Sequence, residues 1–237
     1  MQAGKLATLG ELTTGIAHEL NNPLNNIGLF VGNAIDHVEL GIADRDRLLA
    51  ELRHALQEVR RATAIISHLR TFGRAAPVSR EPVRINGVVR RSFSLLHEQL
   101  RLREIEVRLD LCAEDPVVIG NAIQLEQVVI NLLTNARDAL ADAPRKLIHI
   151  ESAVSEDVVD LLVRDTGPGI PEGLQQRIFD PFFTTKEVGA GTGLGLSISY
   201  GIVKEHGGSI SVVNGAGDGA TFLVQLPLPA HPAEPAR

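Results

Sequence analysis

The chain has 237 residues and a formal net charge of −6, so it carries no overall basic field to attract nucleic acid or an anionic membrane. Cys112 is its single cysteine, which excludes a disulfide framework and a cysteine-based metal site and suits a cytoplasmic location. There is no apolar run of about 18 residues, which a membrane-spanning helix requires. We therefore expect no membrane contact by this segment.

Residues 1–72 are predicted to form a helical hairpin. Apolar residues recur at three- and four-residue steps from Leu6 to Phe30 and again from Leu48 to Leu69, as in two amphipathic helices. Such a hairpin buries little apolar surface alone, so we expect two copies to pair as a four-helix bundle in a homodimer. Pro23 removes a backbone hydrogen bond and is expected to bend the first helix.

His18 is the candidate reactive residue of this hairpin. If Leu20 lies on the packed stripe, His18 lies about 200° round the helix from it and points away from the packed face. Glu19 places a carboxylate beside the imidazole. Taken alone, this pair also fits an ordinary solvated surface histidine.

The segment after the hairpin changes in character. Residues 73–82 lack periodicity and hold two prolines, which predicts a linker. Residues 83–228 mix helical and strand patterns, which predicts an α/β sandwich with a largely antiparallel sheet. Asn86 is expected to cap its first helix. The proline-rich residues 229–237 are predicted to be a disordered tail.

Two glycine motifs in the α/β segment predict a nucleotide site. Asp165 follows a predicted strand and offers an acceptor for an amine, while Gly167 and Gly169 allow a flat ligand to approach the backbone. A simple turn is the alternative. The loop from Gly191 to Leu196 leads into a helix, whose free N–H groups suit phosphate oxygens. It matches neither a P-loop nor a dinucleotide fingerprint.

Two further motifs are weaker when taken singly. Asn131 and Asn135 lie on one face of a predicted helix and can offer amide oxygens to a metal ion, although a satisfied polar helix face is the simpler alternative. The segment from Phe179 to Lys186 holds three of the seven phenylalanines. It fits either the hydrophobic hinge of a mobile lid or a small core cluster.

Taken in order, these motifs resemble the catalytic core of the sensor histidine kinases of bacterial two-component systems, from about Leu6 to Leu226. The resemblance implies a helical hairpin followed by an α/β sandwich of the Bergerat ATP-binding type. The motifs that carry it are His18-Glu-Leu-Asn-Asn-Pro-Leu, Asn131-x-x-x-Asn135, Asp165-x-Gly167-x-Gly169, Phe179-x-Pro181-Phe182 and Gly191-Thr-Gly-Leu-Gly-Leu.

The resemblance implies that His18 accepts a phosphoryl group from ATP, that Glu19 assists it as a base, and that Asn22 takes part in dephosphorylating the partner. The partner is the receiver domain of a response regulator, whose aspartate receives the phosphoryl group. An upstream sensor, which is membrane-bound in some members, and a cytoplasmic position for this segment are implied as well.

In the α/β domain the resemblance implies that ATP binds with Mg²⁺, that Asn135 ligates the metal with Asn131 in support, and that Asp165 binds adenine. Asp138 stands where a basic residue is often found, which leaves open whether Arg137 or Lys186 serves the phosphates. The other implied ATP-binding residues are Gly167, Gly169, Lys186, Gly191, Thr192, Gly193, Leu194, Gly195, Leu196 and Thr221.

Two other classes of function fit parts of the sequence. The ATP-binding half is similar to that of type II topoisomerases and MutL-type proteins, which suggests an ATPase switch without phosphotransfer. A dimeric scaffold with an inactive nucleotide site is the third possibility. The histidine hairpin disfavours the ATPase switch, and the complete set of motifs disfavours the scaffold with an inactive nucleotide site.

Overall fold

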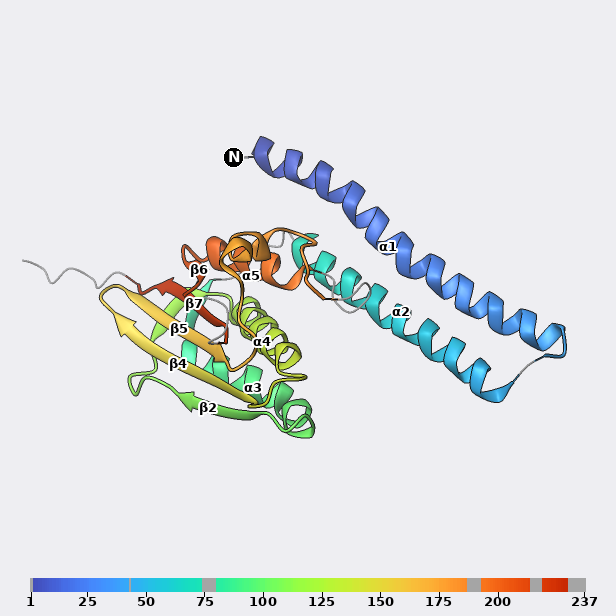
Figure 1. Cartoon of the computed structure of the whole chain (residues 1–237). Helices are drawn as coiled ribbons and strands as arrows, with labels where there is room; N and C mark the ends of the chain where they lie inside the picture. Colours follow the sequence, from blue (N-terminus) through green and yellow to red (C-terminus); the bar gives the residue numbers. More distant parts are fainter. Residues whose placement is uncertain (1, 43, 74–79, 187–192, 214–218, 230–237) are drawn as a thin grey trace, which may run out of the picture. The chain divides into compact units, whose positions relative to one another are not determined.

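A computed structural model of the chain describes residues 2–42, 44–73, 80–186, 193–213 and 219–229, and gives the backbone alone for residues 2–19, 60, 61 and 64–73. The chain divides into a helical unit and an α/β unit (Figure 1). Within the described ranges, no helix is both long and apolar enough to span a membrane.

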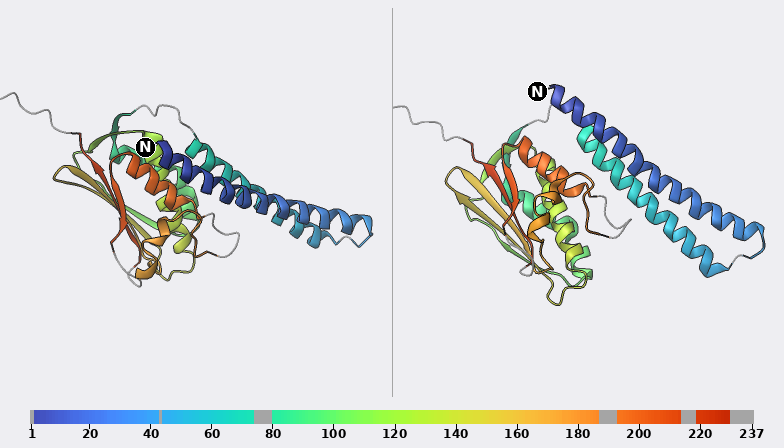
Figure 2. Two further views of the ribbon diagram at one scale, coloured as in Figure 1. Left: turned by 90° about the horizontal axis from the view of Figure 1, so that it is seen from above. Right: turned by 45° about the horizontal axis from the view of Figure 1, so that its top comes forward.

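The helical unit is a hairpin of two long helices. Helix α1 spans Gln2–Glu39 and helix α2 spans Arg45–Gly73, and the two lie side by side in all three views (Figures 1 and 2). Ala34 and Ala55 are buried between them, and the Phe30 and His54 rings lie 5.1 Å apart. The predicted hairpin is therefore confirmed. Helix α1 continues through Pro23.

The hairpin also exposes large apolar side chains on both of its helices. Leu24 and Ile35 on α1 are 56% and 51% exposed, and Leu52 and Leu56 on α2 are 52% and 51% exposed. Scattered exposed apolar residues are ordinary, but a row along both helices of a hairpin is typical of an interaction surface. This is the surface that the predicted four-helix bundle would bury.

The α/β unit has a five-stranded sheet with one face covered by helices (Figures 1 and 2). The strand order is β2-β4-β5-β7-β6; β2 runs parallel to β4 and the other neighbours are antiparallel. A second sheet pairs β1 with β3. The strands are β1 Glu81–Arg84, β2 Glu106–Asp110, β3 Val117–Gly120, β4 Leu147–Ser155, β5 Val158–Asp165, β6 Ser209–Val212 and β7 Thr221–Pro227.

The core of this unit lies between the sheet and its helices. The helices are α3 Ile85–Leu102, α4 Ala122–Ala139 and α5 Gly195–Glu205, with short 3₁₀ turns at Glu172–Leu174 and Arg177–Phe179. Alternate residues of β4 and β5, such as Ile148, Ile150 and Val163, are buried against α4 residues such as Leu132. One packed face and one more polar face are usual for an antiparallel sheet.

The prediction that Asn86 caps a helix is wrong. Helix α3 begins one residue earlier, at Ile85, and the Asn86 side chain is 6% exposed. Its Nδ2 donates to the Cys112 carbonyl (2.6 Å) and its Oδ1 accepts from Ser152 Oγ (2.8 Å). Asp115 serves the helix end instead, because its Oδ1 accepts the Asn86 N–H at 3.1 Å. A cap supplied from a distant loop has no local sequence signal.

Candidate active site

Asp165 ends strand β5 and is the buried carboxylate of the site, at 3% exposure. Its Oδ1 accepts the backbone N–H groups of Gly167 (2.8 Å) and Ala220 (3.3 Å). Burial raises the pKa of this carboxyl, and the two backbone donors partly oppose that rise. No described residue forms a hydrogen bond with Oδ2, so this oxygen remains available to accept one from a ligand.

Gly167 lets the turn after β5 fold back against Asp165. A Cβ on Gly167 would lie 2.8 Å from Asp165 Oδ1 and 3.2 Å from the Ala139 Cβ, so only glycine fits without displacing one of them. The contact with Ala139 also places this turn at the C-terminal end of helix α4. The glycine motif therefore forms a turn and also brings the backbone close to α4. A site that binds a flat ligand against the backbone needs such a close approach.

The two asparagines of helix α4 have different environments. Asn131 is 7% exposed; its Nδ2 donates to the Gly195 carbonyl (3.0 Å) and Ser199 Oγ (3.2 Å), and its Oδ1 accepts from Gln127 Nε2 (3.0 Å). Asn131 is therefore occupied in holding α5 against α4. The half-buried Asn135 amide makes no hydrogen bond with a described residue, so of the pair it is the one free to bind a metal ion.

The described residues contain no group of three or more His, Cys, Asp or Glu side chains that could hold a metal ion. The Asn135 amide oxygen is a hard donor, and a single donor of this kind fits a cation whose other ligands are phosphate oxygens and water, as for Mg²⁺ bound with a nucleotide. The residues present fit Mg²⁺ carried in by a nucleotide, and they do not form a metal cage of their own.

Helix α5 begins without a side-chain cap. Leu194 is its N-cap residue, and no side-chain hydrogen bond caps the helix there, so the first turn offers backbone N–H groups to an anion. Gly193 has φ +64°, and a Cβ there would lie 2.3 Å from the Phe182 carbonyl carbon. Gly191 and Thr192 lie outside the described residues, and their phosphate-binding role stays a prediction, as does that of Leu196.

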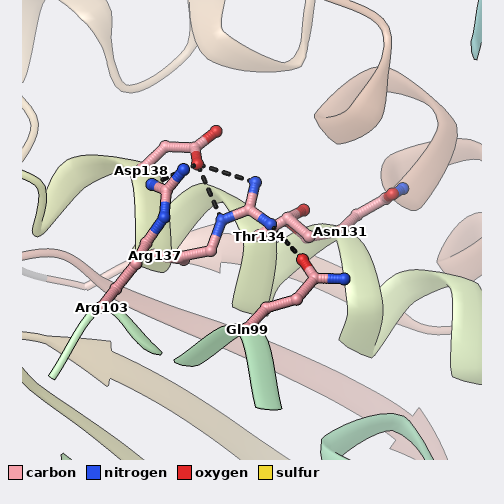
Figure 3. A network of polar contacts seen from close by, with 6 residues as sticks. All are labelled: Gln99, Arg103, Asn131, Thr134, Arg137 and Asp138. Carbon is pink, nitrogen blue, oxygen red and sulfur yellow. Dashed lines mark hydrogen bonds and ion pairs between the residues drawn. The ribbon is translucent and has the colours of Figure 1, made fainter. Parts of the chain in front are cut away.

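Arg137 is engaged on the side of α4 that faces α3 (Figure 3). Its Nε and Nη2 donate to Asp138 Oδ1 (2.9 and 2.8 Å), its Nη1 donates to Gln99 Oε1 (2.8 Å), and Arg103 lies 3.7 Å from Asp138. In Figure 3 the Asn131 side chain points away from this network. The network argues against Arg137 as the phosphate ligand that the sequence left open.

The remaining predicted ligand residues of the α/β unit have different surroundings. Thr221 is 1% exposed, and its Oγ1 accepts from Arg164 Nε at 3.2 Å on the strand next to Asp165. Gly169 follows Gly167 with φ +73°. Lys186 is half-buried and immediately precedes residues outside the described ranges, so its contact with phosphate stays a prediction.

The phenylalanine segment is part of the core edge. Phe179, Phe182 and Phe183 are partly buried against the core, and the Arg177 guanidinium lies 4.7 Å from the centre of the Phe183 ring. This favours the core-cluster interpretation of the segment. The lid that the alternative requires lies outside the described residues.

His18 and Glu19 lie in helix α1, where the backbone alone is described, so the outward orientation of the imidazole stays a prediction. Asn22 is exposed on the same helix, one turn further on.

Sequence reasoning missed one functional backbone group, the Ala220 N–H on Asp165. Gly219, the residue before Ala220, is the sequence feature that could have indicated this contact. A Cβ on Gly219 would lie 1.9 Å from the Asp165 carbonyl oxygen, so glycine is needed for the two segments to lie this close.

An α/β sandwich with a buried aspartate at the end of a strand, an asparagine helix and an uncapped glycine-led helix defines a nucleotide-binding domain of the Bergerat type. The predicted fold class is confirmed. Residues 120–230 match the family described as "Histidine kinase-, DNA gyrase B-, and HSP90-like ATPase". Residues 8–77 match the "His Kinase A (phospho-acceptor) domain".

Similar proteins cover both the helical and the α/β part of the chain. The two-component sensor PprA of Pseudomonas aeruginosa is 41% identical over 238 residues, which cover 98% of this chain and 26% of PprA. The catalytic domain of histidine kinase ThkA is 36% identical, with a TM-score of 0.57 over 63% of this chain and 97% of that one. ThkA in complex with the response regulator TrrA is 30% identical, with a TM-score of 0.78 over 97% of this chain and 64% of that one.

The chain belongs to the sensor histidine kinases of bacterial two-component systems. It spans about a quarter of the length of PprA.

Proposed function

We propose that the chain is the kinase core of a sensor protein, in which ATP bound by the α/β unit phosphorylates His18 and the phosphoryl group passes to an aspartate of a response regulator. The single observation that carries the nucleotide half of this proposal is Asp165. A carboxylate that is 3% exposed, with both backbone donors on Oδ1 and none on Oδ2, is suited to accept the amino group of adenine.

The phosphates would be held at the opposite side of the same site. The uncapped start of α5 offers backbone N–H groups and the positive end of the helix dipole. Asn135 offers an amide oxygen on α4, one turn beyond the Asn131 that holds α5 in place. When bound, Mg²⁺ supplies neutralisation of the phosphate charge, which is the main electrostatic requirement of phosphoryl transfer.

In the helical unit, His18 supplies the nucleophile. A neutral imidazole can attack only through a nitrogen that carries no proton, so the other nitrogen has to hold the proton. Glu19, the next residue, is proposed to accept that N–H and to fix the tautomer. Catalysis by this chain then consists of positioning His18 against the bound nucleotide and keeping the attacking nitrogen unprotonated.

Two partners follow from this proposal. The receiver domain of a response regulator is supported by the solved complex of ThkA with TrrA, and Asn22 is proposed to help dephosphorylate it. A second copy of this chain is supported by the exposed apolar rows of α1 and α2, such as Leu24 and Leu56, which a four-helix bundle would cover. A cytoplasmic position of the segment belongs to the same proposal.

The test is incubation with γ-labelled ATP and Mg²⁺, followed by acid and alkali treatment of the protein. A phosphohistidine is labile in acid and stable in alkali, so label with this behaviour is the expected result. ATP hydrolysis with no label on the protein would favour the ATPase switch instead. Failure to bind Mg·ATP at all would favour the scaffold.

A further inference from the structure

His206 is a buried histidine that the proposed mechanism does not use. It is 6% exposed and ends helix α5 as its C-cap residue. Its Nδ1 lies 2.8 Å from the Ile202 carbonyl oxygen and its Nε2 lies 3.0 Å from the Asn121 backbone nitrogen. A carbonyl only accepts and a backbone N–H only donates, so the proton is on Nδ1 and Nε2 is the acceptor.

The Asn121 N–H that His206 accepts belongs to the residue that starts helix α4. Asn121 is the N-cap of α4, and its own Oδ1 accepts the Gln124 N–H at 3.0 Å. One imidazole therefore joins the C-terminal end of α5 to the N-terminal end of α4. A second contact between these ends, Gln124 Nε2 to Glu205 Oε2, is 3.5 Å long and exposed, so it adds little.

The other end of α5 is joined to α4 by Asn131, which donates to the Gly195 carbonyl and to Ser199 Oγ. Helix α5 thus runs antiparallel to α4 and is joined to it at both ends of α5 (Figure 1). Asn135 lies one turn beyond the Asn131 contact, and the uncapped N–H groups of α5 lie at Gly195. The register of α5 against α4 therefore sets the distance between the Asn135 amide and the first N–H groups of α5, which are both proposed to bind the phosphates of one nucleotide.

We propose that His206 is a positioning residue for Mg·ATP, which fixes this register by accepting the Asn121 N–H. The proposal rests on the proposed nucleotide site. It predicts an asymmetry within that site, because Asp165 is held by Gly167 and Ala220 and not by α5. Loss of the His206 contact should disturb the phosphate end and leave the adenine end intact.

The test compares the affinity of the full chain for Mg·ATP with its affinity for adenosine, which has no phosphates, by calorimetry. His206→Phe removes both hydrogen bonds and leaves a buried N–H unsatisfied, so Mg·ATP binding should weaken by about 10-fold. Adenosine binding should change by less than about twofold. His206→Gln, which can still present an acceptor to Asn121, should recover most of the loss.

A second variant tests the contact without changing the histidine. A Cβ on Gly120 would lie 2.7 Å from His206 Nε2 and 2.5 Å from its Cδ2, so Gly120→Ala should displace the ring and reproduce the selective loss. His97→Gln, at an exposed histidine of α3, is the matched control and should bind both ligands normally.

Three outcomes are distinguishable. Selective loss of Mg·ATP affinity in His206→Phe and Gly120→Ala supports the proposal. Equal loss of both ligands, or no change in either, overturns it and leaves His206 with a purely structural role or none. If the unaltered chain binds neither ligand, the proposed function itself fails, whatever the variants do.

Discussion

Asp165→Asn separates recognition of adenine from the stability of its pocket. The asparagine keeps Oδ1 as an acceptor for Gly167 and Ala220, so the turn should stay folded. It replaces Oδ2 by an amide that donates, which then faces the adenine amino group, another donor. An unpaired polar group in a buried site costs about 1–3 kcal/mol, which corresponds to about 5- to 150-fold weaker ATP binding.

The same exchange should alter the choice between nucleotides. GTP presents an oxygen where adenine has its amine, so the Asp165 carboxylate should reject GTP, whereas the asparagine amide can donate to it. We expect calorimetry to show strong preference for ATP in the unaltered chain and a much smaller or reversed preference in Asp165→Asn, with little change in melting temperature. Equal binding of ATP and GTP by the unaltered chain would refute this role of Asp165.

The pKa of Asp165 gives the pH dependence of the same interaction. Because burial raises it, the carboxylate takes up a proton on acidification at a higher pH than an ordinary aspartate, whose pKa is about 3.9. As the pH is lowered, ATP affinity should therefore begin to fall at a higher pH than it would if Asp165 had the pKa of an ordinary aspartate. Asp165→Asn should not show this loss of affinity on acidification. Folding stability depends on pH in the opposite direction to ATP affinity. Burial of the ionised Asp165 carboxylate does not destabilise the fold at a pH below the pKa of the unfolded chain, and it destabilises the fold by its full amount at a pH above the raised pKa of the folded chain.

Three other predictions concern the backbone of the site and the hairpin. Gly193→Ala places a Cβ at φ +64° against Phe182 and should lower the free energy of unfolding by about 2 kcal/mol or more. The control is Gly201→Ala, where a Cβ meets no other atom within 4 Å, and it should raise the free energy of unfolding by about 0.5–1 kcal/mol. A similar loss of stability in both variants would contradict the geometry. Asn22→Ala should slow dephosphorylation of the regulator and leave phosphorylation of the chain largely intact in a labelling assay; equal loss of both would indicate a structural role. Leu56→Glu should give monomers in analytical ultracentrifugation, whereas the neighbouring exposed Gln57→Glu should remain dimeric, and an unchanged dimer in both would place the interface elsewhere.

The sequence predicted the elements well wherever their signal is local. Apolar periodicity located α1 and α2, and the sequence also predicted the helix that carries Asn131 and the strand that precedes Asp165, because these elements pack one face on a core. The errors lie where distant residues decide the structure. Asn86 looks like a helix cap, yet the N–H is capped by Asp115, which lies 29 residues away.

The site shows the same division. Asp165 and Asn135 were proposed as ligand residues from motifs, with Asn131 in a supporting position, but the groups that each amide contacts could not be predicted from the motif. Asn131 is held by α5, whose first residue lies 64 positions along the chain. His206 was missed because nothing near it indicates that its ring reaches Asn121, 85 residues earlier.

In the proposed mechanism one unit supplies the nucleophile and the other supplies Mg·ATP. The measurement that tests it most directly is acid-labile label from γ-labelled ATP on His18→Gln and Asn135→Ala, with Mg·ATP affinity determined for each. His18→Gln should bind Mg·ATP as the unaltered chain does and carry no label. Asn135→Ala should carry no label because its Mg·ATP affinity is lost, although His18 is intact. Acid-labile label that persists on His18→Gln would contradict the account, because another histidine would then be the phosphoacceptor.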